Sequence, residues 1–287
     1  MRSKFQKPLR LSTLAQALNL NLVGKDIDLN HVAPISHSVD GSLSFLTRDR
    51  EMEFPNVGLI AFDKFSHKSV SYLLAANPRL TFARALHWLE ANNYFTEYNQ
   101  DAKIHPSVKI GQFVSIGRNV EIGEGTVILP NVVIHNGVTI GKRCMIKSGT
   151  VIGQDGFGFE RDENQVPFRI PHVGTVVIGD DVEIGSLNTV CRGTLRDTVI
   201  GNNVKIDDHV HVAHNVQIGA KTYVIACAEL SGGVVIGEEA WISPQSSIKE
   251  QLKIGKGAMV GLGAVVLKDV PEYKTVVGNP ARILEKK

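Results

Sequence analysis

The sequence predicts a mainly β protein, in which a parallel β-helix over residues 101–270 follows a small α/β domain over residues 1–100. Three observations predict this fold. Aliphatic residues recur every six positions from Ile104 to Val266, with two interruptions, and all 24 positions hold Ile, Leu or Val. Glycine follows many of them, where a sharp corner favours a residue without Cβ. The first hundred residues lack this spacing, and residues 271–287 form a C-terminal tail.

The six-residue period predicts a triangular coil. Such a period fits neither a helix nor a long strand, so each repeat is a short extended segment that ends in a turn. Three sides use about 18 residues, and coils stack about 4.8 Å apart with the aliphatic residue inside. Between Ile152 and Ile178 the chain has twenty residues more than one six-residue repeat requires, and between Val190 and Ile200 it has four more. We expect the first, an inserted loop over residues 153–177, to carry function, because long loops in compact domains are more often functional than idle.

The N-terminal hundred residues predict a mixture of helices and strands. Ser12 is expected to cap a helix through TLAQAL. The segments DGSLSFLT, VGLIAFD and YLLAANP are predicted as strands, bounded by turn residues. Residues 81–92 predict an amphipathic helix with one apolar side, formed by Phe82, Leu86 and Leu89.

Composition excludes several classes of protein. The 287 residues include 31 Lys and Arg against 29 Asp and Glu, so the formal net charge is only +2. Nucleic acids and anionic membranes need a concentrated basic face, so neither is expected as the main partner. No apolar run approaches the roughly 20 residues of a spanning helix. The N-terminal stretch lacks a continuous apolar segment, so we expect no secretion and a cytoplasmic protein. Three cysteines without disulfide or zinc spacing are expected to be reduced and buried: Cys144, Cys191 and Cys227.

The order of motifs along the chain is more specific than the fold. SLSFLT and NPRLTFAR precede the hexads, and DGFGF, RGTLRDT and VAHNVQIG follow among them. This order resembles the N-acyltransferase family of lipid A synthesis, which acylates the 2-amine of UDP-3-O-(3-hydroxyacyl)glucosamine, over nearly the whole chain. The repeat resembles the hexapeptide-repeat family, whose left-handed parallel β-helices associate as trimers. The resemblance implies a nucleotide-sugar-binding N-terminal domain with Phe45 in its site, an active-site loop at DGFGF, and His214 as general base.

The chain departs from that family in two places and ends differently. Arg48, Asp49, Arg50 and Glu51 stand where the family has an Asn-Pro-x-Tyr segment against uracil, and Gln251 stands where it has a second histidine. The final VVGNPARILEKK resembles the ends of short-chain sugar acyltransferases that use coenzyme A. These departures imply an N-acyltransferase that moves an acyl group from acyl-CoA to a nucleotide-linked amino sugar, for surface polysaccharide or lipopolysaccharide synthesis. The alternative is the lipid A enzyme itself, with acyl carrier protein as donor.

Acyl transfer from a thioester to an amine requires a base, aligned reactants and an oxyanion donor. His214 suits the base, because histidine as a residue type has an unperturbed pKa of about 6.5. Asp207, seven residues earlier, is expected to orient the imidazole or to contact the sugar. One coil of 18 residues places Gly232 directly above His214, where its N–H is available to an oxyanion. The predicted catalytic residues are His214, Gly232 and Asp207.

Other residues are assigned to binding. His209 and His211 are either substrate contacts or ordinary surface residues, and the two loop phenylalanines either line an acyl site or anchor the loop on a neighbouring prism. The predicted substrate-binding residues are Phe45, Arg48, Phe157, Phe159, His209 and His211. Related enzymes run the pantetheine arm of the coenzyme between prisms, and this resemblance implies contacts at Gly263, Ala264, Lys268 and Arg282. We expect no tightly bound cofactor and no metal.

Two other functions fit the same prism. Carbonic anhydrase-like hexapeptide proteins bind zinc through His-x4-His and a third histidine, and His209 with His214 has the first spacing. No histidine follows His214, which disfavours this function. A repeat prism can also serve only as a scaffold. The histidine cluster, the SGG segment and the long loop favour an enzyme instead.

Overall fold

A computed structural model describes residues 3–49 and 53–284, which form two compact units. The N-terminal unit comprises Met1–Glu97, Gly158–Gly174 and Thr194–Arg196. The prism unit comprises Tyr98–Phe157, Thr175–Gly193 and Asp197–Lys287. The sequence places the inserted loop in the β-helix domain, whereas most of its residues pack with the N-terminal unit.

The N-terminal unit contains a six-stranded mixed sheet with the strand order β1-β3-β4-β5-β6-β2. Strands β3 to β6 are parallel to their neighbours, and β1 and β2 pair antiparallel at the two edges. The predicted strands are confirmed as β4, β5 and β6, while β1, β2 and β3 were not predicted. The strands are β1 (Lys4–Arg10), β2 (Leu22–Val23), β3 (Asp28–Val32), β4 (Ser42–Leu46), β5 (Gly58–Phe62) and β6 (Ser71–Ala75); a short 3-10 helix, η1, spans Ile35–His37.

The longer helix, α2 (Pro78–Ala91), begins three residues before its predicted start. Asn77 is the N-cap, and its side-chain oxygen accepts the Leu80 N–H at 3.1 Å. Proline at the first helical position has no N–H to satisfy, so the helix starts there without loss. The predicted apolar side is confirmed, because its three members are buried: Phe82, Leu86 and Leu89.

The short helix, α1 (Leu11–Ala17), is not capped by Ser12. Ser12 lies inside the first turn instead, and both its N–H and its hydroxyl donate to the Asp26 carboxylate, at 2.9 and 2.7 Å. Burial opposes the shift, but these hydrogen bonds together with the guanidinium of Arg10 lower the pKa of Asp26. The prediction was wrong because a distant carboxylate satisfies the first-turn donors that a cap residue normally satisfies.

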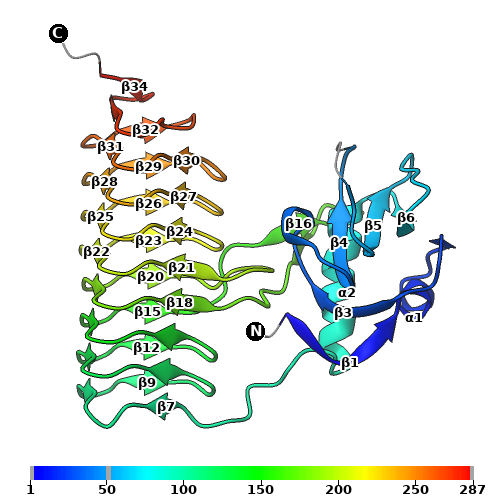
Figure 1. Ribbon diagram of the computed structural model, residues 1–287, viewed down its shortest axis with the longest axis horizontal. Helices are drawn as coiled ribbons and strands as arrows, with labels where there is room; N and C mark the ends of the chain where they lie inside the picture. The colour runs from blue at the N-terminus through cyan, green and yellow to red at the C-terminus, as the bar shows by residue number, and fades with distance from the viewer. Residues whose placement is uncertain (1–2, 50–52, 285–287) are drawn as a thin grey trace. The chain divides into compact units, whose positions relative to one another are not determined.

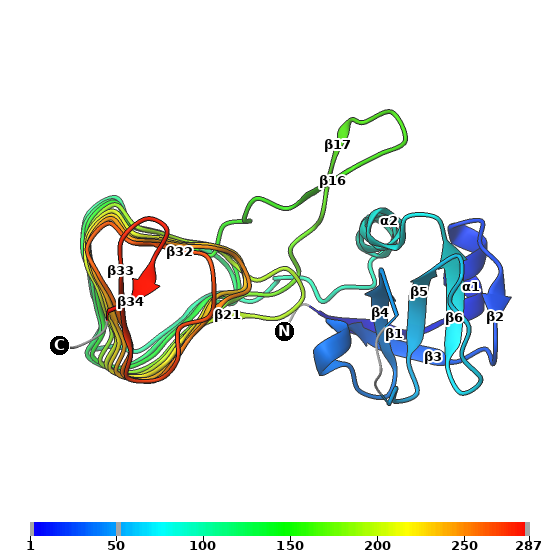
Figure 2. The same ribbon diagram turned by 90° about the horizontal axis from the view of Figure 1, so that it is seen from above.

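The prism unit consists of three sheets, parallel apart from one final antiparallel strand, that wrap into a triangular coil, seen from above in Figure 2. We call the sheets face one, face two and face three, in the order in which the chain visits them, and the turns that follow them the first, second and third corner. Figure 1 shows the coils stacked along the prism.

Face one contains β7 (Lys103–Ile104), β10 (Glu121–Ile122), β13 (Thr139–Ile140), β18 (Val176–Ile178), β21 (Thr198–Ile200), β24 (Gln217–Ile218), β27 (Val235–Ile236) and β30 (Lys253–Ile254). Face two contains β8 (Lys109–Ile110), β11 (Val127–Ile128), β14 (Met145–Ile146), β19 (Glu183–Ile184), β22 (Lys205–Ile206), β25 (Tyr223–Val224), β28 (Trp241–Ile242), β31 (Met259–Val260), β33 (Thr275–Val277) and β34 (Arg282–Ile283). Face three contains β9 (Ser115–Ile116), β12 (Val133–Ile134), β15 (Val151–Ile152), β20 (Thr189–Val190), β23 (His211–Val212), β26 (Glu229–Leu230), β29 (Ser247–Ile248) and β32 (Val265–Val266).

The aliphatic hexads form the core of the prism, as the period predicts. Every hexad position from Ile122 to Val266 is buried. Ile104 and Ile110 are exposed, because they belong to the end coil. At the other end β33 pairs with β31 and stacks Val276 on Val260, so the coil continues beyond residue 270.

Both interruptions occur at the third corner. Ile178 pairs with Ile140, and Ile200 pairs with Ile178, so the extra residues leave the inward register intact. Strand bounds define a long insertion, residues 153–175, and a short insertion, residues 191–197. The long one is two residues shorter than predicted, because β18 already begins at Val176. It contains an antiparallel hairpin of β16 (Phe159–Arg161) and β17 (Pro167–Arg169).

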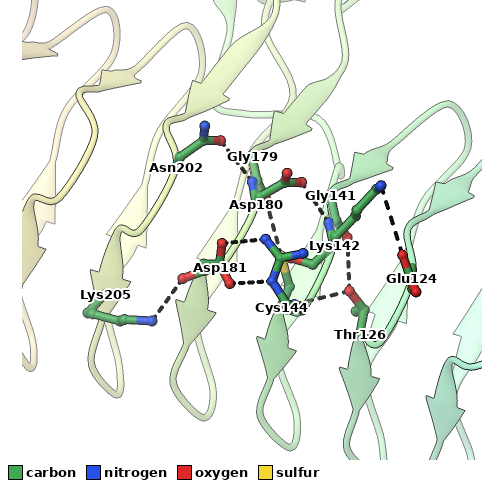
Figure 3. Close-up of polar contacts among 11 residues, drawn as sticks. Glu124, Thr126, Gly141, Lys142, Cys144, Gly179, Asp180, Asp181, Asn202 and Lys205 are labelled. Carbon is green, nitrogen blue, oxygen red and sulfur yellow. Dashed lines mark hydrogen bonds and ion pairs between the residues drawn. The ribbon is translucent and has the colours of Figure 1, made fainter.

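Charged side chains alternate in sign along the first corner (Figure 3). Lys142 Nζ lies 3.9 Å from Glu124 on the preceding coil, and Arg143 donates two hydrogen bonds of 2.7 Å to Asp181 on the following one. Lys205 Nζ donates to the Asp181 carbonyl at 2.8 Å. Exposed pairs of this kind contribute little to stability. Like charges stacked one coil apart would repel, so the alternation favours the observed register.

The cysteines differ from one another in exposure. Cys144 and Cys191 are buried, as expected, and burial raises the pKa of the Cys191 thiol to about 11. Cys227 is exposed, so the prediction was wrong there. It occupies a left-handed position of the second corner, with φ of 61°, and its side chain therefore points away from the core.

Candidate active site at the third corner

Successive coils place six side chains or glycines in one column at the third corner. Each member is the second residue after a strand of face three, so the members stack at about 4.8 Å per coil. Figure 1 shows the strands that lead to this corner, from β15 to β32. We call this set the third-corner column; it consists of Gln154, Arg192, His214, Gly232, Glu250 and Lys268.

His214 and Gly232 are in direct contact in this column. A Cβ built on Gly232 would lie 2.7 Å from Cε1 and 2.9 Å from Nε2 of His214, closer than side chains pack. The predicted stacking is therefore confirmed. The Gly232 carbonyl accepts the N–H of Gln251 at 3.0 Å, while its own N–H donates no hydrogen bond to any residue within 3–49 and 53–284. That N–H is available to a ligand beside the imidazole.

Asn215 orients the imidazole. Its side-chain oxygen lies 3.0 Å from Nδ1 of His214. An amide oxygen only accepts, so Nδ1 carries the proton in this hydrogen bond. Asn215 is itself held by the hydroxyl of Thr198, which accepts its N–H at 2.9 Å. Sequence reasoning missed Asn215, although it directly follows the histidine in the AHN segment.

Asp207 and His209 do not share this corner. Both follow β22 and are exposed at the second corner, whereas His214 follows β23 at the third. The prediction that Asp207 orients His214 is wrong within one chain, because seven residues advance the chain by about one side of the triangle. His211 lies between the corners on face three, and its Nδ1 is 2.6 Å from the Thr189 hydroxyl. The histidine cluster of the sequence is thus spread over two corners and a face.

Arg192 lies one coil below His214 and is almost fully buried, with 7% of its side chain exposed. Its Nε donates to the Gly153 carbonyl at 2.6 Å, and its Nη2 donates to the Asn136 carbonyl at 2.9 Å. Burial, together with the positive charge of Arg192, lowers the pKa of neighbouring His135. Sequence reasoning missed Arg192. An arginine at a column position inside a short interruption of the repeat was the available signal.

The N-terminal unit holds three of the predicted substrate residues. Phe45 on β4 is half-buried, with its ring 4.9 Å from that of Phe82. Arg48 is exposed just beyond the carboxyl end of β4. Phe159 on β16 lies under the guanidinium of Arg169, which is 4.7 Å from its ring centre. Of the segment that departs from the family pattern, Arg50 and Glu51 lie outside the described residues.

The long insertion is tied to α2 within that unit. Arg84 makes two hydrogen bonds to the Glu163 carboxylate, at 2.9 and 2.6 Å, and Arg79 lies 3.3 Å from Glu160. Phe157, in the prism unit, precedes the hairpin and is 87% exposed. The two loop phenylalanines that the sequence treats together therefore belong to different units.

The predicted coenzyme residues lie on different sides of one prism. Gly263 is at the second corner with φ of +62°, and a Cβ built there would meet no atom within 4 Å. Lys268 is exposed in the third-corner column, and Arg282 is exposed on face two. Ala264 does not fit a coenzyme contact, because its side chain is fully buried and its N–H and carbonyl are both hydrogen-bonded. A single chain does not bring these residues together.

Within the described residues the chain has neither a membrane-spanning helix nor a cluster of metal ligands. Across residues 3–49 and 53–284, no helix combines the length and apolar character needed to cross a membrane. Over the same described ranges, no three His, Cys, Asp or Glu residues gather as metal ligands would. His209 and His214, which have the zinc spacing, stand at different corners.

Comparison with known proteins places this geometry in a family. A family model described as bacterial transferase hexapeptide (six repeats) matches residues 99–129, 119–154 and 197–232, which include His214 and Gly232. A UDP-3-O-acylglucosamine N-acyltransferase of Coxiella burnetii is 37% identical over 77% of this chain and 74% of its own length. The chain belongs to the UDP-3-O-acylglucosamine N-acyltransferase family. It is a hexapeptide-repeat acyltransferase with a parallel β-helix.

A second relative supports the family, and a solved structure supports the acyltransferase fold. The relative of this name from Caulobacter sp. (strain K31) is 33% identical over 90% of this chain and 84% of its own. The solved structure of Francisella novicida UDP-N-acetylglucosamine acyltransferase is 33% identical, with a TM-score of 0.57 over 62% of this chain and 63% of that one. The long insertion lies mostly outside the segments that the family model matches.

Proposed function

We propose that this chain transfers an acyl group from a thioester to the amine of a UDP-linked glucosamine, for lipid A or a related surface glycolipid. The observation that carries the proposal is the imidazole of His214 stacked on Gly232 at the third corner. The names of relatives support the acceptor, since they specify UDP-3-O-acylglucosamine and UDP-N-acetylglucosamine.

The arrangement supplies the groups that the reaction needs. A neutral amine attacks the thioester carbonyl carbon, and Nε2 of His214 takes the proton that nitrogen loses as the C–N bond forms. The carbonyl electrons move to oxygen, where the N–H of Gly232 donates to the oxyanion. The intermediate then breaks its C–S bond, and the imidazolium gives its proton to the departing thiolate. The products are an amide and a free thiol, with His214 neutral again.

The nucleotide is assigned to the N-terminal unit. Arg48 follows the carboxyl end of β4, and open sheets with parallel strands bind ligands beyond the carboxyl ends of those strands. Its guanidinium suits a diphosphate. Phe45 on the same strand offers an aromatic ring that is only half-buried.

The donor is assigned to the upper coils of an assembled trimer. Acyl-CoA and acyl carrier protein both present the acyl group as a phosphopantetheine thioester. Lys268 and Arg282 offer charge to its phosphate, and Gly263 offers open space, but they lie on different sides of one prism. Prisms side by side would bring such sides together. Light scattering should give about 94 kDa, three times the 31.3 kDa chain.

The testing experiment measures thiol release by the purified protein. Acetyl, 3-hydroxybutyryl and long-chain 3-hydroxyacyl donors, on CoA and on carrier protein, are combined with UDP- and dTDP-linked amino sugars. Turnover should require a UDP-glucosamine acceptor and fall at least about 100-fold in His214→Ala. His105→Ala, at the exposed first corner, is the control and should retain activity. Full activity of His214→Ala, or turnover only with dTDP-sugars, would overturn the proposal, and the active donor identifies CoA or carrier protein.

A further inference from the structure

The two insertions of the prism contact each other where they leave the coil, and we call residues 153–157 the root of the long insertion. Arg192, in the short insertion, makes contacts with three consecutive residues at the start of the long one. Besides the hydrogen bond to the Gly153 carbonyl, its N–H donates to the Gln154 carbonyl at 2.9 Å, and its guanidinium lies 3.7 Å from the Asp155 carboxylate. The long insertion therefore leaves the coil along a path that one side chain defines.

The return of the long insertion is held by the other end of the short one. The Asp197 carboxylate accepts the Thr175 N–H at 2.8 Å, and the Thr198 N–H donates to the Thr175 carbonyl at 2.9 Å. The Thr175 hydroxyl donates to the Gly137 carbonyl one coil below, at 2.7 Å. Both ends of the long insertion are thus fastened by residues at the two ends of the short insertion.

The same contacts lead to the imidazole. Thr198, which holds the return of the long insertion, also accepts the N–H of Asn215 through its hydroxyl. Asn215 in turn accepts from Nδ1 of His214. Arg192 and His214 are neighbours in the third-corner column, one coil apart. The return of the long insertion is therefore joined to the imidazole by hydrogen bonds through Thr198 and Asn215, while its start is held by Arg192, the neighbour of His214 in the column.

Only arginine suits the position of Arg192. Its guanidinium reaches two carbonyls on different coils and a carboxylate at once, which a planar fork of five donors permits and a single ammonium does not. Neighbouring side chains also restrict the backbone at the start of the root. Gly153 has φ of +89°, and a Cβ there would lie 2.5 Å from Val138 and 3.3 Å from His135. An unanchored root would have to leave the coil differently.

We propose that Arg192 is a positioning residue that fixes the root of the long insertion in line with His214, and that the short insertion exists to hold the long one. This inference deepens the proposed function and rests on it for its kinetic consequence. Its structural consequence is independent of any activity, because it concerns only how firmly residues 153–157 are held.

Two variants and a matched control test the proposal. Arg192→Gln removes the charge and three of the five N–H donors, while Arg192→Lys keeps the charge. Arg118→Gln is the control, because Arg118 occupies the corresponding third-corner position on the lowest coil, where it is exposed. Chymotrypsin cleavage after Phe157, followed by mass spectrometry, reports how firmly the root is held. We expect cleavage about tenfold faster in Arg192→Gln, an intermediate rate in Arg192→Lys, and the original rate in Arg118→Gln.

Kinetics provide the second measurement. A misplacement of about 1 Å costs up to about 100-fold in rate, so kcat should fall 10- to 100-fold in Arg192→Gln, with partial rescue in Arg192→Lys and little change in the KM of the donor. An unchanged cleavage rate overturns the proposal whatever the activity. Faster cleavage with unchanged kcat overturns the link to His214. If both Arg192 variants unfold, the residue is a global stability element and the proposal is also wrong. Faster cleavage in a protein that shows no acyl transfer with any donor supports the anchoring and rejects only the proposed function.

Discussion

The variant Gly232→Ala should move the imidazole of His214 without lowering the stability of the prism. The added Cβ would lie 2.7 Å from Cε1 of His214, whereas ordinary contacts begin at 3.4 Å, so the ring must move by about 0.7 Å. A displacement near 1 Å costs up to about 100-fold in rate, and we expect kcat to fall 10- to 100-fold. The φ of Gly232 is not in the left-handed region, so alanine adopts the backbone without strain. The melting temperature should change by less than about 3 °C.

Gly233→Ala is the matched control, one residue along the same turn. Gly233 has φ of +73°, so alanine there costs roughly 1 kcal/mol or more in backbone strain. Its added Cβ would meet only Gln251, at 3.5 Å, and would leave His214 in place. Thiol release and thermal melts of both variants should therefore show opposite patterns: lost activity in Gly232→Ala and lost stability in Gly233→Ala. Wild-type kcat in Gly232→Ala would refute the role assigned to the stacked ring.

Three further outcomes follow from the structure. Burial and the charge of Arg192 lower the pKa of His135, so the unfolded chain binds a proton near pH 6.5 that the folded chain does not bind. The contribution of His135 to stability is therefore full above that pH and is lost as the pH falls below it. Between pH 7 and 5, the melting temperature should fall less steeply in His135→Gln than in His105→Gln. Ile242→Ala, at a fully buried hexad, should lower the free energy of unfolding by 2–5 kcal/mol in chemical denaturation, and a loss below 1 kcal/mol would contradict the packed core. Cys227 should react with maleimide in the native protein before the two buried thiols, and simultaneous labelling of all three would show that the prism opens.

The repeat made the prism and the His214–Gly232 contact predictable. Each coil returns the chain to the same place after 18 residues, so a difference of 18 in residue number means direct contact along a column. The same arithmetic excludes Asp207 as a partner of His214, since seven residues lead to another corner. Asn215 was also within reach of sequence reasoning, because it is adjacent to His214 at a corner that needs a left-handed residue.

The contacts of Arg192 were not predictable in this way. They join residues 39 and 56 positions apart, and neither separation is a multiple of the coil length because insertions intervene. The Ser12 hydrogen bonds to Asp26 belong to the same class, since a side chain distant in sequence replaces a local cap. Cys227 shows the converse case, in which a residue type that is usually buried is turned outward by a left-handed φ.

The sequence by itself determined the stacked prism, its inward hexads and the contact of His214 with Gly232, because these depend on the six-residue spacing of aliphatic residues. The tertiary structure alone decided where the polar side chains of the two insertions meet, with Arg192 holding Gly153 and Asp155. The physical reason is that a periodic element has its contacts at fixed sequence separations. An insertion has no period, and its partners are set only when the folded coils bring its two ends to the same corner.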